Sequence, residues 1–215
     1  MIFEDRADAG QQLAARLQSL QLPAPVVLAL PRGGVPVAAE VARVLRAPLD
    51  LLLVRKIGAP QQPELAIAAV ADAAEPVLEI DADSLRYSGA TPSYVQAQLP
   101  AQLAEIERRR ALYLGGRAPL DLHGRSAVLV DDGIATGTTV RAALKALRRR
   151  QPSRLVLAVP VAPAQALPLL RPEVDELVCL WAPERFHAVG AHYRDFEQTS
   201  DATVVALMQR YGPAG

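Results

Sequence analysis

The sequence predicts an α/β fold built on a parallel, twisted sheet of about five strands that is flanked by helices. Three observations lead to this prediction. Short apolar runs alternate with helix-like segments along the chain. The runs are rich in Val and Leu, as expected of strands that are buried on both faces. Two of the runs end in glycine-containing turns that precede a helix, which is where open α/β sheets bind ligands.

The first half of the chain supplies two of the strands. The predicted order is a helix over 8–20, a strand over 26–30, a helix that ends near residue 45, and a strand over 49–54. Residues 56–92 contain scattered Pro and Gly and are predicted to be irregular, with a hairpin at 65–70 and 76–80. A charged helix over 93–114 follows, and its Arg108–Arg110 run is predicted to be a solvated flank.

The second half supplies the remaining three strands, at 126–130, 154–159 and 176–181. The helix after the first of them has an apolar face at Val140, Ala143, Leu144 and Leu147. A helix is expected over 164–170, an irregular stretch over 183–200, and a last helix over 201–211. All of this fits a single domain spanning 1–215.

Composition excludes several classes of protein. The formal net charge is +0 and the aromatic content is 4%, which argue against a nucleic-acid-binding surface and against base-stacking platforms. The single cysteine, Cys179, predicts a buried core thiol rather than a disulfide or metal ligand. The first ten residues do not resemble a signal peptide, and the apolar segment 155–170 is too short to cross a membrane. These features predict a cytoplasmic protein with no membrane partner.

The most informative stretch is VLVDDGIATGTT, residues 128–139. Asp131 and Asp132 follow a buried strand directly, and two neighbouring carboxylates need donors or a cation to offset their repulsion. A ribose with two adjacent hydroxyl groups, together with a divalent cation, supplies such partners.

The turn after the acid pair is suited to a phosphate. Gly133 and Gly137 allow backbone N–H groups to converge, and the following helix directs its N-terminal amides toward the same point. Thr138 or Thr139 can cap that helix. An ordinary strand–turn–helix with a capping threonine is the alternative interpretation.

The whole string resembles the signature of the type I phosphoribosyltransferases, and the resemblance extends over roughly residues 22–200. It implies a 5-phosphoribosyl-1-pyrophosphate substrate, Mg²⁺ as cofactor, and a catalytic role for Asp131 and Asp132, which would contact the ribose hydroxyls and help to hold the metal. The residues implied to take the 5-phosphate are Gly133, Ile134, Ala135, Thr136, Gly137, Thr138 and Thr139.

The same resemblance assigns pyrophosphate to Arg32, Gly33 and Gly34, in a loop that is expected to carry a non-proline cis peptide beside Arg32. Arg55 and Lys56 end the predicted second strand and would add cations for the pyrophosphate, with a solvated strand edge as the alternative. The segment after them, about 56–92, corresponds to the flexible lid of the family.

The C-terminal stretch 181–200 is similar to the hood of these enzymes, the segment that covers the acceptor. Phe186, His187 and Val189 would form the acceptor pocket, with Phe186 stacking on a planar ring. Asp195 resembles a hood carboxylate that helps to hold Mg²⁺. Core packing or a surface loop is the alternative for each. The acceptor is expected to be a nitrogen compound, a nucleobase, and the family resemblance implies a homodimer.

Two positions depart from the family pattern. The 6-oxopurine enzymes have an aspartate where this chain has Ala135, which weakens a hypoxanthine or guanine acceptor. Ala68 stands where a lid glycine is expected. Two other functions remain open: a non-catalytic regulator that binds a sugar phosphate or nucleotide on this fold, and a sugar-phosphate hydrolase or isomerase.

Overall fold

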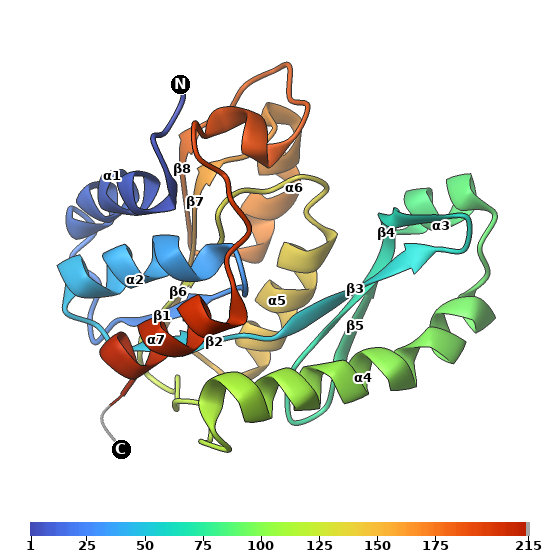
Figure 1. Ribbon diagram of the computed structural model, residues 1–215, viewed down its shortest axis with the longest axis horizontal. Helices are drawn as coiled ribbons and strands as arrows, with labels where there is room; N and C mark the ends of the chain where they lie inside the picture. The colour runs from blue at the N-terminus through green and yellow to red at the C-terminus, as the bar shows by residue number, and fades with distance from the viewer. Residues whose placement is uncertain (214–215) are drawn as a thin grey trace.

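The computed structural model describes residues 1–213. Figure 1 shows a central sheet between two layers of helices, with a narrower sheet extending to one side. The helices and strands are α1 Arg6–Gln18, β1 Val26–Ala29, α2 Gly34–Leu45, β2 Leu49–Leu51, β3 Val54–Ala59, β4 Gln62–Ala71, β5 Val77–Ile80, α3 Ala82–Ser88, α4 Pro92–Leu114, β6 Ser126–Val130, α5 Thr138–Arg149, β7 Arg154–Val161, α6 Leu167–Leu170, β8 Glu176–Trp181 and α7 Asp201–Tyr211.

The predicted five-stranded parallel sheet is confirmed. Its order is β2-β1-β6-β7-β8, and every neighbouring pair is parallel. The chain passes from β1 to β2 on one side and later returns to β6 on the other, so the order reverses between β1 and β6. This reversal point is where open α/β sheets bind their ligands.

The strands of this sheet are apolar on both faces because both faces are covered. Val27 and Ala29 of β1 pack into one hydrophobic core with α1, α2 and α7, whereas Val26 and Leu28 pack into a second core with α5 and α6. Figure 1 shows these two helical layers on opposite sides of the sheet. Side chains alternate between faces along a strand, so each strand must supply apolar residues at every position.

Residues 56–92 are more regular than the sequence predicts. The expected hairpin exists, but β4 and β5 join β3 in a three-stranded antiparallel sheet, and α3 follows it. Helix α4 lies along this sheet, as Figure 1 shows. The prediction of an irregular segment was therefore wrong; the motion of the lid remains a prediction.

The predicted second strand, 49–54, is divided between the two sheets. The main sheet ends at Leu51, and the next strand, β3, begins at Val54 in the antiparallel sheet. Arg55 and Lys56 therefore do not end a strand of the main sheet, contrary to the prediction. Arg55 donates from Nε to Gln102 Oε1 at 3.2 Å, and Lys56 donates from Nζ to Glu64 Oε2 at 2.7 Å.

Two further predictions concern the C-terminal part. Residues 183–200 are largely irregular as expected, apart from a short 3-10 turn at Val189–His192. Cys179 is half-buried rather than a core residue, because β8 is an edge strand with one open side; burial still raises the pKa of its thiol. The single domain over 1–215 remains a prediction, and 214–215 lie outside the described residues. No helix within 1–213 is long and apolar enough to cross a membrane.

Candidate functional site

A cavity of about 270 Å³ opens where β1 and β6 end. Its lining comes mainly from the loop after β1 with Arg32 and Gly33, the stretch after β6 with Asp131, Asp132 and Thr139, and residues 196, 198 and 199 of the hood. Arg6 and Val54 complete it. The predicted pyrophosphate loop and the predicted acid pair therefore share one cavity. Arg55 and Lys56 are absent from its lining.

The acid pair lines this cavity, and burial there disfavours the ionised form of both side chains. Burial raises the pKa of Asp131 well above its usual range, and the neighbouring Asp132 carboxylate raises it further. Burial also raises the pKa of Asp132, against the opposing effect of the Arg6 guanidinium. Hydroxyl donors or a cation placed against these carboxylates would offset that cost.

The turn after the acid pair leaves the N-terminus of α5 open. Gly137 is the residue before the helix, with φ of 83°, and no side chain caps the helix amides. The prediction that Thr138 or Thr139 caps α5 was wrong: Thr138 Oγ1 lies 3.3 Å from Asp81 Oδ2 at the start of α3. Uncapped N–H groups behind a glycine turn are suited to bind an anion.

Not every residue of the predicted phosphate turn can contribute an amide. Ile134 N–H donates to the Val161 carbonyl at 2.9 Å, and the Ile134 side chain is buried in the core. Ala135 and Thr136 are exposed, and Thr139 lines the cavity. The amides beyond Ile134 are therefore the ones that an anion can use.

The loop after β1 has the expected unusual backbone. The Pro31–Arg32 peptide bond is cis, as predicted. Gly33 and Gly34 pack directly against the acid pair: a Cβ on Gly34 would lie 2.9 Å from Asp131 Cα, and a Cβ on Gly33 would overlap an Asp132 carboxylate oxygen. These glycines are required for space, since φ of Gly33 is −61° and any residue can adopt it.

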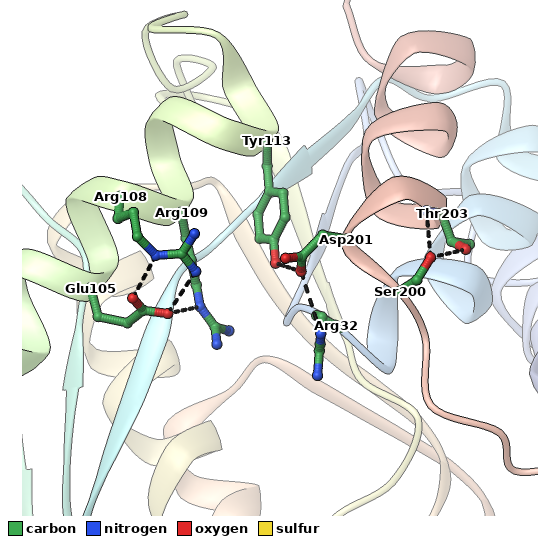
Figure 2. Close-up of polar contacts among 8 residues, drawn as sticks. All are labelled: Arg32, Glu105, Arg108, Arg109, Tyr113, Ser200, Asp201 and Thr203. Carbon is green, nitrogen blue, oxygen red and sulfur yellow. Dashed lines mark hydrogen bonds and ion pairs between the residues drawn. The ribbon is translucent and has the colours of Figure 1, made fainter.

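Residues that lie outside the cavity lining hold the Arg32 side chain in place. Its Nη1 lies 3.4 Å from Asp201 Oδ1 at the start of α7, and the same oxygen accepts a hydrogen bond of 2.6 Å from the Tyr113 hydroxyl on α4 (Figure 2). Burial, followed by the Asp201 carboxylate, raises the pKa of Tyr113 to about 12, so the phenol stays a donor at neutral pH. This chain of contacts links two helices to the predicted pyrophosphate loop.

The Arg108–Arg110 run is not only a solvated flank. Arg108 and Arg109 both donate to Glu105, at 2.8 and 2.7 Å, beside Tyr113 and Asp201 (Figure 2). These hydrogen bonds lower the pKa of Glu105 to about 2. The Arg109 side chain is only 18% exposed, and its charge adds to burial in lowering the pKa of Arg55.

Tyr113→Phe tests the support of Arg32. We expect the variant to bind pyrophosphate about threefold to tenfold more weakly, because Asp201 then lacks one donor and holds Arg32 less firmly. The free energy of unfolding should fall by about 1 kcal/mol or less, the usual net contribution of one hydrogen bond. Calorimetric titration with Mg²⁺-pyrophosphate measures the first effect and urea denaturation the second. Unchanged affinity would show that Arg32 needs no support from α4.

The hood residues are only partly arranged as predicted. Val189 packs over Gly133, where a Cβ would come within 2.6 Å of a Val189 methyl carbon, so the hood does cover the turn. Phe186 stacks on His192 with ring centroids 5.5 Å apart, and His187 is exposed. Asp195 is also exposed and accepts from Glu197 N. Within 1–213, no three metal-ligating side chains converge, so Asp195 does not join the acid pair.

Several residues in the cavity lining or behind it have no signal in the sequence. Arg6 of α1 donates from Nε to Asp132 Oδ2 at 2.9 Å, and its guanidinium lies 3.9 Å from the centroid of the Phe196 ring. The Tyr193 hydroxyl donates to the Asp132 carbonyl at 2.5 Å. Phe3 pairs with Tyr193 in an isolated bridge, which ties the N-terminal segment to the hood. Only the folded chain brings these residues together.

Comparison with known proteins agrees with this geometry. The family model described as "Phosphoribosyl transferase domain" matches residues 4–187. The chain is 48% identical over 209 residues to "Putative phosphoribosyl transferase Rv0571c" of Mycobacterium tuberculosis, which covers 97% of this chain and 47% of that protein. The chain thus spans about half the length of the curated relatives it matches.

Two solved structures are similar in fold. The crystal structure of TT1426 from Thermus thermophilus has a TM-score of 0.82 and 44% sequence identity, covering 99% of this chain and 100% of that chain. The structure of AQ2163 from Aquifex aeolicus has a TM-score of 0.52 at 13% identity, covering 86% and 78%, and shows the fold alone. The family match, which takes in both the acid pair and the loop after β1, shows that this chain belongs to the phosphoribosyl transferase domain family.

Proposed function

We propose that this chain transfers the phosphoribosyl group of 5-phosphoribosyl-1-pyrophosphate to a nitrogen atom of an acceptor, a nucleobase, and releases pyrophosphate. One observation carries the proposal. A partly buried acid pair and an uncapped helix N-terminus, both from the stretch 128–139, meet an arginine-bearing loop around one cavity at the reversal point of the sheet. Each group matches one part of this substrate.

In this proposal the open amides at the start of α5 bind the 5-phosphate, and Thr139 adds a hydroxyl from the cavity wall. The Asp131 and Asp132 carboxylates accept hydrogen bonds from the 2- and 3-hydroxyls. Arg32 and the Gly33 amide hold the pyrophosphate; the predicted Gly34 amide does not contribute, because it already donates to the Leu30 carbonyl at 3.1 Å. Two hydroxyl donors also offset the cost that burial imposes on the ionised acid pair.

The reaction breaks the bond between C1 and the pyrophosphate oxygen, whose electron pair departs with pyrophosphate. Positive charge builds on the sugar, and the Asp131 and Asp132 carboxylates stabilise it electrostatically. A nitrogen lone pair of the acceptor then forms the new bond to C1, and the nitrogen releases its proton. The hood closes over the acceptor side through Val189 and Phe196 and excludes water.

The donors present fit Mg²⁺ as the cofactor. The two acid side chains offer the hard oxygen ligands that Mg²⁺ prefers, and in phosphate enzymes the remaining ligands commonly come from water and substrate oxygens. This matches a site in which no third protein ligand converges among residues 1–213. When bound, the ion would neutralise charge on the departing pyrophosphate. Asp195 is exposed and does not line the cavity, so we assign it no part in holding the ion.

Ala135 is exposed and carries no proton acceptor, which keeps a 6-oxopurine acceptor disfavoured. A nucleobase acceptor would place the chain in nucleotide metabolism. A homodimer and a cytoplasmic setting remain predictions.

Two measurements test the proposal. Calorimetry with 5-phosphoribosyl-1-pyrophosphate and Mg²⁺ should show binding, and a panel of nucleobases should give acceptor-dependent release of pyrophosphate. Binding without turnover of any acceptor would favour a regulator. Products formed without an acceptor would favour a hydrolase or isomerase. Absence of sugar-phosphate binding would refute the proposal.

Gly33→Ala should abolish this binding, because the new methyl group would occupy the space of the Asp132 carboxylate in the cavity. The substitution is compatible with the local backbone, so the protein should still fold. We expect an affinity loss of about 100-fold or more, since a misplaced site group commonly costs that much. A thermal melt checks the fold, and calorimetry checks the affinity. Near wild-type affinity would place the sugar phosphate elsewhere.

A further inference from the structure

Arg6 has the contacts of a ligand-binding residue. It enters the cavity from α1, and its side chain is only 12% exposed. Nε donates to Asp132 Oδ2 at 2.9 Å and Nη1 donates to the Glu197 carbonyl at 2.7 Å. The guanidinium stacks on Phe196, 3.9 Å from the ring centroid. The group is thus held at three points between the acid pair and the hood.

These contacts leave part of the guanidinium without a partner. A guanidinium has five N–H donors, and only Nε and Nη1 donate to residues within 1–213. Nη2 and the second hydrogen of Nη1 remain for a ligand in the cavity that Arg6 lines. A buried ion pair by itself contributes little to stability, so packing alone does not account for a guanidinium here.

The position of Arg6 suits contact with the acceptor rather than with the sugar phosphate. The proposed phosphate and pyrophosphate groups belong to the turn after β6 and the loop after β1. Arg6 instead reaches the cavity together with Phe196, on the part of the wall that the hood supplies. In the proposed binding mode the acceptor attacks C1 from the side opposite the pyrophosphate, and the wall formed by Arg6 and Phe196 is a part of the lining that we assign to neither phosphate group.

We propose that Arg6 binds the acceptor directly and selects a planar acceptor that carries a carboxylate group beside its reactive nitrogen. A guanidinium matches a carboxylate in shape and charge and can donate two parallel hydrogen bonds to it. Phe196 holds the guanidinium flat, and Asp132 fixes its orientation. This inference rests on the proposed function and narrows its acceptor class.

The test compares acids with neutral molecules of nearly the same shape. Orotate is paired with uracil and nicotinate with nicotinamide, and each is titrated calorimetrically into protein that contains Mg²⁺ and ribose 5-phosphate, which cannot react. We expect wild-type protein to bind at least one acid about tenfold or more tightly than its neutral counterpart. Charge-assisted hydrogen bonds commonly provide such a ratio.

Arg6→Gln should reduce this ratio to about twofold or less, and Arg6→Lys, which keeps the charge, should retain part of it. Because Arg6 also pairs with Asp132, a proposed ribose ligand, each ratio is measured at saturating ribose 5-phosphate. Arg194→Gln is the matched control, because this hood arginine is 69% exposed and pairs with Glu4 outside the cavity. It should leave the ratio unchanged. A purely structural Arg6 would alter the melting temperature but not the ratio.

Four outcomes would count against the role of Arg6 or against the proposed function. Equal binding of acids and neutral partners by wild type, or a preference that survives Arg6→Gln, overturns the inference. If Arg6→Gln does not fold, Arg6→Lys with an unchanged acid preference also overturns it, because a charge without the planar fork would then suffice. Failure of wild type to bind ribose 5-phosphate would instead count against the proposed function.

Discussion

Asp131→Asn is expected to lower kcat by about 100- to 1000-fold, the usual effect of removing one preorganised electrostatic group from an active site. The side chain keeps its shape, and its amide oxygen can still accept from Asp132 N, which donates to Asp131 Oδ1 at 2.9 Å. The loss should therefore come from the missing charge. Steady-state assays of pyrophosphate release measure it, together with calorimetry for the sugar phosphate.

The same variant should be more stable than the ligand-free wild type at neutral pH. Burial and the Asp132 charge raise the pKa of Asp131 in the folded state, so its ionised form opposes folding. This penalty is absent below the unfolded pKa, near 4, grows as pH rises, and is complete above the folded pKa. Urea denaturation between pH 4 and 8 should show the advantage of Asp131→Asn growing with pH.

Asp195→Asn is the control, because this exposed carboxylate lies outside the cavity. It should change neither stability nor sugar-phosphate binding appreciably. An Asp131→Asn protein that is less stable than wild type at pH 7 would identify the acid pair as a structural element. Full activity in that variant would remove Asp131 from the mechanism.

The main sheet could be predicted because its strands are short apolar runs with polar ends. Strands β6 and β8 and helix α7 have the predicted bounds, 126–130, 176–181 and 201–211. The prediction of one strand over 49–54 was wrong because the run of apolar residues continues from β2 of the main sheet to the start of β3 in the antiparallel sheet. Asp50 interrupts that run and is fully buried, satisfied by Arg117 Nη2 at 2.7 Å and Leu120 N at 2.8 Å. Those partners lie 67 and 70 positions away, which no local pattern reveals.

The site residues also fall into two groups: those that a local sequence pattern reveals and those that it does not. The acid pair and the turn after it were predictable because a contiguous string carries them. Arg6 was not, because its partner Asp132 is 126 positions away and a single arginine at the start of an amphipathic helix carries no signal in sequence. The hood aromatic was assigned to Phe186, whereas Phe196 lines the cavity. Both aromatics lie in an irregular stretch without periodicity to indicate which one points inward.

Ion pairs connect the antiparallel sheet to α5, and removing them should have a large effect on stability. Glu79 on β5 is buried, and it accepts from Arg141 Nε at 3.0 Å and from Lys145 Nζ at 2.5 Å on α5. Glu79→Gln should lower the free energy of unfolding by about 2–3 kcal/mol, because two cations lose their counter-charge in a partly buried contact. The antiparallel sheet would be held less firmly to α5, the helix that follows the proposed phosphate turn, so we expect 5-phosphate affinity to fall as well.

The dependence on pH separates this ion pair from general packing. Burial acts to raise the pKa of Glu79, but hydrogen bonds from Lys145 and Arg141 outweigh it, and the pKa lies below the ordinary 4.5. A depressed pKa stabilises the fold above the unfolded value and ceases to do so as pH falls through the folded one. The stability difference between wild type and Glu79→Gln should thus be complete at pH 7 and shrink below about pH 4.5. Glu64→Gln on β4 is the control, since its ion pair with Lys56 is exposed to solvent and should contribute little to stability. Equal losses in the two variants, or a difference that does not change with pH, would mean that the antiparallel sheet is fixed to α5 by apolar packing rather than by charge.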